Sequence, residues 1–173
     1  MSNLQFIQSA EGYSVSSIDL HNCFSEKYDN YMISLVKGDQ TENNYTFARY
    51  ISESGLDTSS NYDSAGQSVR SYASFGEMRF TNQTSIKNIA YRGSERNRGD
   101  SIVYYVFNPF DSSKHTFGMA QASGHFSSGL FGVKHISVHK VAVRMTGMRF
   151  FPGGGSYDSV KVNCYGILTW VVV

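Results

Sequence analysis

Histidines are the first residues whose type and spacing could support chemistry. The chain has five: His21, His115, His125, His135 and His139. The last two are four positions apart, which on a β-strand puts both side chains on one face but about 13 Å from each other, too far to share one metal ion. The pattern therefore favours structural histidines, and we expect neither a metal nor another cofactor.

Paired carboxylates or an activated nucleophile would indicate catalysis. A glycosidase needs two carboxyl groups about 5 to 10 Å apart, but the acidic candidates lie in predicted turns or at strand ends, where Asp accepts hydrogen bonds from backbone amides: Asp57, Asp63, Glu77, Glu95, Asp100, Asp111 and Asp158. The chain has no Gly-x-Ser-x-Gly motif, and its two cysteines, Cys23 and Cys164, are predicted to be buried thiols. We therefore expect a noncatalytic protein.

Two loop segments could still bind a partner or a phosphate. Arg92, Arg96 and Arg98 form the densest positive cluster, and guanidinium groups bind carboxylates bidentately. They are a candidate partner-binding loop, with a solvated loop as the alternative. The glycines at 153–155 precede a segment with strand character, whereas a phosphate cradle needs a helix N-terminus. We expect them to supply positive φ angles in a hairpin.

Tyrosines near polar loops offer a third candidate chemistry, the stacking of an aromatic ring on a sugar. Tyr62, Tyr72 and Tyr91 are the candidate glycan-binding residues. The chain contains 12 Tyr and 12 Phe, most of which must be housed in the core or at its rim, so burial is the alternative for each of the three.

The elements that must position these residues are β-strands. Apolar residues alternate with a period of two, and the clearest segments are 31–36, 45–51, 102–107, 115–122, 130–133, 136–145 and 160–173. Loops are expected at 55–66, 92–100 and 111–114. About eight to ten strands with almost no helix are typical of a β-sandwich or barrel.

Composition limits the class of function. Charged residues make up 17% of the chain, against about 25% in a typical domain, and the net charge is +1. No strong field is available to attract nucleic acid or anionic lipid. The sequence has no signal-peptide pattern at its start and no run of 18 apolar residues. We expect one soluble domain that binds neither nucleic acid nor membrane.

The order of several motifs resembles a group of small β-rich structural proteins of tailed, mostly aquatic, bacteriophages. The resemblance runs from about Leu4 to Leu168 and is carried by QFIQSAEGYSVSSIDLHN, FSEKYDNYMISL, YTFARYISESGLDTSSNYDS, SIVYYVFNPFDSS and MTGMRFFPGGGSYDSVKVNCYGI. It implies an all-β, single antiparallel jelly-roll-like sandwich in a tail fibre, baseplate or capsid decoration, and it supplies no catalytic residues. This chain differs from the group by continuing beyond Ile167.

These observations define the expected organisation and function. Residues 1–20 form an N-terminal arm and first strand, and residues 21–173 form the sandwich. We expect a noncatalytic virion protein, made in the host cytoplasm, that forms a homotrimer or another symmetric oligomer and contacts other phage proteins. The alternative is a carbohydrate-binding adhesin that recognises host surface glycans.

The two ends of the chain are the expected interfaces, because terminal segments can add a strand to a neighbouring subunit. The residues concerned are Leu4, Phe6, Trp170, Val171, Val172 and Val173. The tail holds the single Trp. There, the alternative to an interface is that the protein's own opposite sheet covers the tail.

Overall fold

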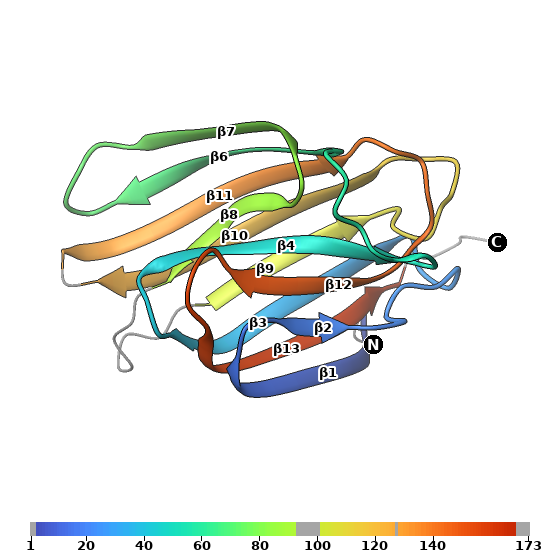
Figure 1. Cartoon of the computed structure of the whole chain (residues 1–173), viewed down its shortest axis with the longest axis horizontal. Coiled ribbons are helices and arrows are strands. Elements are labelled where there is room, and N and C mark those ends of the chain that lie inside the picture. Colours follow the sequence, from blue (N-terminus) through green and yellow to red (C-terminus); the bar gives the residue numbers. More distant parts are fainter. Residues whose placement is uncertain (1–2, 93–100, 127, 169–173) are drawn as a thin grey trace.

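Antiparallel strands form the regular structure of the protein. The computed structural model describes residues 3–92, 101–126 and 128–168, which contain thirteen strands and no helix. The described part of the chain thus has no helix that could cross a membrane. The all-β class and the antiparallel sandwich expected from the sequence are confirmed (Figure 1).

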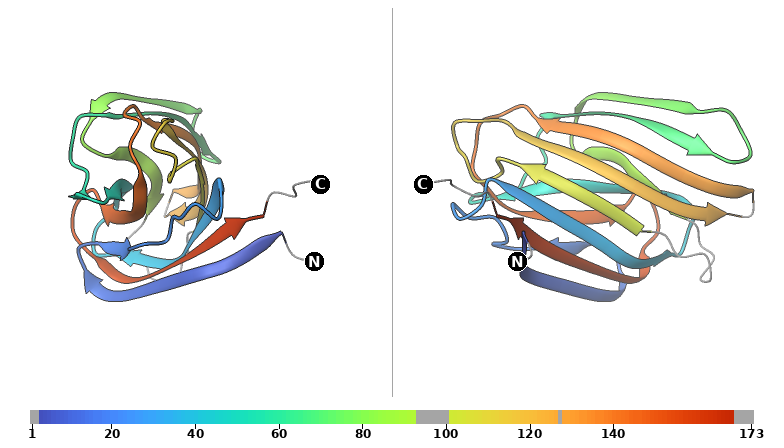
Figure 2. Two further views of the ribbon diagram at one scale, coloured as in Figure 1. Left: turned by 90° about the vertical axis from the view of Figure 1, so that its right-hand side faces the viewer. Right: turned by 180° about the vertical axis from the view of Figure 1, so that it is seen from behind.

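The larger sheet has eight strands in the order β1-β13-β3-β9-β10-β11-β6-β7. Figure 2 shows it curving around the smaller sheet, so that its outer face is convex. Strands β1 and β7 are its two edges. Its strands span Leu4–Val15 (β1), Tyr157–Ile167 (β13), Asn30–Gln40 (β3), Ser101–Phe107 (β9), Thr116–Phe126 (β10), Gly129–His139 (β11), Tyr62–Arg70 (β6) and Gly76–Gln83 (β7).

The smaller sheet covers the inner face of the larger one (Figure 1). Its order is β2-β12-β4-β5, and β8 also pairs with β4. The strands span Ile18–Leu20 (β2), Met145–Pro152 (β12), Asn44–Ser52 (β4), Gly55–Leu56 (β5) and Ile86–Arg92 (β8).

The core lies between the sheets and is rich in tyrosine. Alternation along each strand sends every second side chain inward, and the largest buried residues include Tyr31, Tyr50, Tyr62, Tyr104 and Tyr157. A buried phenol needs a hydrogen-bond partner. The Tyr104 hydroxyl lies 2.7 Å from the Ser137 Oγ, and the Tyr31 hydroxyl donates to the Ser25 carbonyl at 2.8 Å.

Several expected boundaries are wrong. The described residues form thirteen strands instead of the expected eight to ten, because short or polar segments such as β2, β5 and β7 pair despite their weak apolar alternation. β6 begins at Tyr62, inside the expected loop, and the expected strand 136–145 is divided between β11 and β12. The glycines at 153–155 do not close a hairpin; they connect β12 in one sheet to β13 in the other. Of the three, Gly155 has the positive φ, 68°.

Candidate functional site

The outer face of the larger sheet carries a row of apolar side chains from one edge strand to the other. Residues directly opposite each other on antiparallel strands point to the same face, so the register defines rows across the sheet. The Met119 row consists of Phe6, Tyr165, Met32, Tyr105, Met119, Ile136, Ala65 and, at its end, Arg79. Ile136 is 61% exposed and Phe6 is 56% exposed.

A second row with the same character lies beside it. The Phe117 row consists of Leu4, Ile167, Asn30, Phe107, Phe117, Val138 and Asp63. On the other side of the Met119 row the surface becomes polar, in the Gln121 row of Ser9, Asn163, Ser34, Val103, Gln121, Lys134, Gln67 and Glu77. We call the Met119 and Phe117 rows together the assembly face.

The assembly face is hollowed on both sides of Ile136 and Met119. A hollow of about 600 Å³ opens toward Phe117 and Val138, and one of about 380 Å³ opens toward Gln121. Contiguous exposed apolar surface that is bordered by polar residues marks a site of protein association. The shape and polarity of this face fit a protein surface better than a charged small molecule.

The predicted interface residues divide between this face and the undescribed tail. Leu4 and Phe6 lie on β1 and belong to the Phe117 and Met119 rows, so the structure brings both to the assembly face. β1 pairs with β13 of the same chain along most of its length, and β2 belongs to the other sheet. The described part of this segment, residues 3–20, is therefore built into both layers. Trp170, Val171, Val172 and Val173 lie outside the described residues.

The predicted partner-binding arginines are described only in part. Arg92 ends β8, while Arg96 and Arg98 lie outside the described residues. The assignment of Tyr62 to glycan binding is wrong, since its ring is fully buried beneath the sheets.

The two remaining tyrosines are at least partly exposed. Tyr72 is 44% exposed beyond the end of β6. Tyr91 is half-buried, with its ring centroid 4.7 Å from that of Tyr45 and 5.6 Å from that of Phe131. Tyr72 and Tyr91 both lie close enough to Tyr45 to affect its pKa, whereas the buried Tyr62 cannot join them in contacting a sugar.

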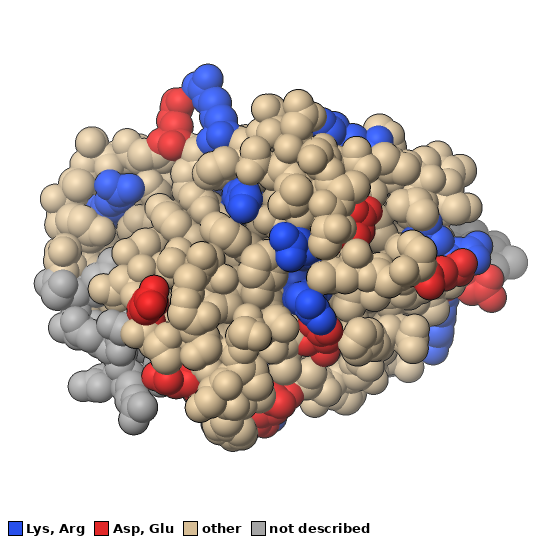
Figure 3. Space-filling view, in the orientation of Figure 1, with Lys and Arg blue, Asp and Glu red and all other residues tan. Residues whose placement is uncertain are grey.

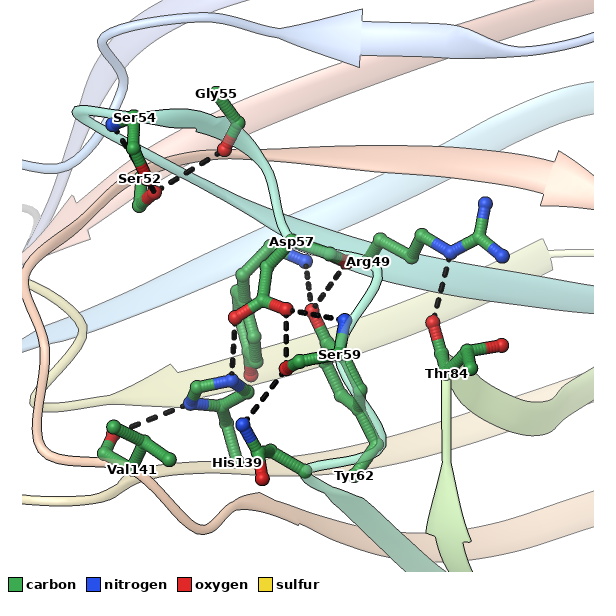
Figure 4. Close-up of polar contacts among 12 residues, drawn as sticks. Arg49, Ser52, Ser54, Gly55, Asp57, Ser59, Tyr62, Thr84, His139 and Val141 are labelled. Atoms are coloured by element: carbon green, nitrogen blue, oxygen red, sulfur yellow. Dashed lines mark hydrogen bonds and ion pairs between the residues drawn. The ribbon is translucent and has the colours of Figure 1, made fainter.

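A polar contact that the sequence did not reveal joins Asp57 to the buried His139 (Figure 4). The imidazole Nε2 lies 2.7 Å from Asp57 Oδ2, and Nδ1 lies 3.2 Å from the Val141 carbonyl oxygen. Both nitrogens face acceptors, and the ring donates to both only in its protonated form. Burial alone would raise the pKa of Asp57, but hydrogen bonds from Ser59 and the neighbouring His139 outweigh it and lower the pKa.

The pair ties the β5–β6 connection to the end of β11. Asp57 Oδ1 accepts hydrogen bonds from the Ser59 amide and hydroxyl, as expected for a turn aspartate. The Tyr62 hydroxyl donates to the Asp57 carbonyl and accepts from the Tyr50 amide, each at 3.1 Å. His139 is completely buried, so the contact holds the fold together and is closed to a substrate.

The other titratable or nucleophilic side chains of note, His135, Cys23 and Cys164, are buried. Burial lowers the pKa of His135 to about 4, although its Nε2 lies 2.9 Å from the Lys87 carbonyl oxygen. Cys23 and Cys164 are buried free thiols, as expected, and burial together with the adjacent Cys164 raises the pKa of Cys23. Among the described residues, no three His, Cys, Asp or Glu side chains lie together as metal ligands would.

Comparison with models of protein families and with curated proteins finds no match to this chain. Among solved structures, it is similar to the crystal structure of the marine PL-14 alginate lyase from Aplysia kurodai. The identity is 11%, the match covers 85% of this chain and 72% of that chain, and the TM-score is 0.34.

Proposed function

We propose that the chain is a noncatalytic structural subunit of a bacteriophage virion that assembles with copies of itself as a symmetric oligomer. The observation that carries the proposal is the assembly face, which spans the larger sheet and includes Leu4 and Phe6. The resemblance of the motif order to small phage structural proteins supports the virion setting, the jelly-roll topology and contacts to other phage proteins.

A second copy is the occupant that best fits this face. In a two-fold symmetric contact the same patch meets itself, so the apolar rows of one copy pack on the apolar rows of the other. The polar Gln121 row then lies at the rim, which is the usual arrangement of an interface. The scarcity of charge in the chain agrees with a subunit that has much of its surface in contact with neighbours.

The test compares two substitutions on one strand and one face. Met119→Glu places a charge within the Met119 row, whereas Gln121→Glu places it two residues along β10 in the polar row. A carboxylate buried without a partner opposes association strongly. We expect Met119→Glu to weaken self-association at least tenfold in sedimentation velocity and Gln121→Glu to leave it within about twofold of wild type.

Two results would overturn the proposal. One is a wild-type protein that stays monomeric at millimolar concentration, and the other is an equal effect of both substitutions. The virion setting is tested separately, by mass spectrometry of purified particles of the phage that encodes the chain. We expect peptides of this protein there in many copies, and their absence from intact particles would remove the virion role.

A further inference from the structure

The outer face of the smaller sheet carries a row of charged residues. Asp19 on β2, Arg149 on β12 and Arg49 on β4 lie directly opposite one another in the register. Arg149 binds Asp19 bidentately, with both nitrogen–oxygen distances at 2.6 Å. Lys87 on β8 adds a third cation next to Arg49. Figure 3 shows Lys and Arg side chains gathered over the middle of this face. We call these four residues the basic row.

Two cations of the basic row have no acidic partner among the described residues. Arg49 uses its Nε to donate to the Thr84 carbonyl at 2.8 Å, and its terminal nitrogens point away from Asp57 (Figure 4). No salt bridge of Lys87 occurs in the described chain either. Burial and the charge of Arg49 lower the pKa of Lys87. Like charges that are close and unneutralised disfavour each other, so a bound anion would stabilise both.

Aromatic rings hold the two cations in position. The Arg49 guanidinium lies 4.8 Å from the ring centroid of Phe151, and Lys87 Nζ lies 4.4 Å from that of Phe47. The two rings are themselves 5.7 Å apart, edge to face. A side chain that is already held in place loses less freedom when it binds a ligand. The rings are covered by the cations, so this surface presents fixed positive charge.

We propose that the basic row binds an acidic polysaccharide, with Arg49 and Lys87 contacting a sugar carboxylate. The row continues past Arg149 into a cleft of about 450 Å³. Asn22, Ser52 and Thr146 line this cleft and can accept hydrogen bonds from sugar hydroxyls. The two carboxylates in its lining, Asp19 and Glu53, are paired with Arg149 and Arg144. The site lies on the opposite side of the sandwich from the assembly face and goes beyond the structural role.

Nucleic acid fits the same surface less well. Single-stranded nucleic acid binds by stacking its bases on exposed aromatic faces, but here Arg49 and Lys87 occupy the faces of Phe151 and Phe47. Two unpaired cations also neutralise few phosphates, which leaves such binding weak at physiological salt.

The experiment measures binding of a purified galacturonate hexamer by calorimetry and NMR titration at low ionic strength. The methyl-esterified hexamer, which lacks the negative charges, is the matched ligand, and a 12-nucleotide single-stranded DNA is the competing anion. We expect the wild type to bind the hexamer at least tenfold more tightly than either. We expect Arg49→Gln and Lys87→Gln each to weaken binding at least tenfold.

Lys134→Gln is the control variant, since it removes an exposed cation from the polar Gln121 row on the opposite side of the sandwich. It should bind the hexamer within about twofold of wild type. The proposal fails if the ester binds equally well, if DNA binds more tightly, if all three variants behave alike, or if the wild type does not bind at 10 mM hexamer. Because Lys87→Gln is separate from Arg49→Gln, a folding defect in one still leaves the other to decide. Self-association is followed in the same samples, so that a failure here is distinguished from a failure of assembly.

Discussion

At the scale of single residues, the Asp57–His139 pair is a polar contact between distant segments of the chain. Its partners are 82 positions apart, and the histidine is completely buried. We expect Asp57→Asn to lower the free energy of unfolding by about 2 kcal/mol at pH 7, because it leaves a buried imidazole without its charged partner. Urea unfolding followed by circular dichroism measures this loss.

The contribution of Asp57 to the free energy of unfolding should depend on pH with a defined sign. Folding lowers the pKa of Asp57 below the ordinary value of 3.8. The stabilisation from its ionised form is therefore present above that value and is lost as the pH falls through the folded pKa. The difference between wild type and Asp57→Asn should accordingly shrink below about pH 4. Asp29→Asn removes an exposed carboxylate from the turn immediately before β3 and should change little. Equal losses in both variants would contradict this assignment.

Gly118 on β10 leaves room for a hydrogen bond between the strands on either side of it, β9 and β11. The Tyr104 hydroxyl from β9 crosses β10 to reach Ser137 on β11, and a Cβ at Gly118 would overlap that hydroxyl. We expect Gly118→Ala to lower the free energy of unfolding by about 2 to 3 kcal/mol. Gly132→Ala is the control, because its added methyl meets only the Ala122 carbonyl, at 3.3 Å.

A double variant separates steric overlap from an effect on the strand itself. Tyr104→Phe removes the hydroxyl that the new methyl would meet. Thermal unfolding of Gly118→Ala with Tyr104→Phe should therefore show less destabilisation than the sum of the two single variants. Strict additivity would mean that the overlap is not the cause.

The strands most visible in the sequence were those with strong alternation. Segments 31–36, 45–51 and 102–107 lie within β3, β4 and β9, because their inward positions are large and apolar. The order of the strands was not accessible, since it depends on pairing between distant segments such as β3 and β9. The assembly face and the Asp57–His139 pair depend on that register, and so local pattern could not reveal them. Tyr62 was misplaced for a related reason: its polar neighbours suggested a loop, but β6 turns the ring inward.

The whole molecule presents two outer faces of opposite character. The larger sheet offers apolar rows, whereas the smaller sheet offers Arg49 and Lys87, which have no acidic partner in the described part of the chain. The sandwich core separates the two faces, so self-association at one and ligand binding at the other should respond independently to solution conditions. A subunit of this design can associate with one face and keep the other free for a ligand.

Varying the salt concentration tests whether the two faces act independently. Screening weakens attraction between exposed charges, but it does not weaken burial of apolar surface, which salting-out anions even strengthen. On raising NaCl from 50 to 500 mM, we expect the affinity for the galacturonate hexamer to fall at least fivefold, as a charge-dominated contact requires. Self-association measured by sedimentation should stay unchanged or become tighter over the same range. A parallel fall of both quantities would mean that charge drives association too, and that the two faces act as one surface.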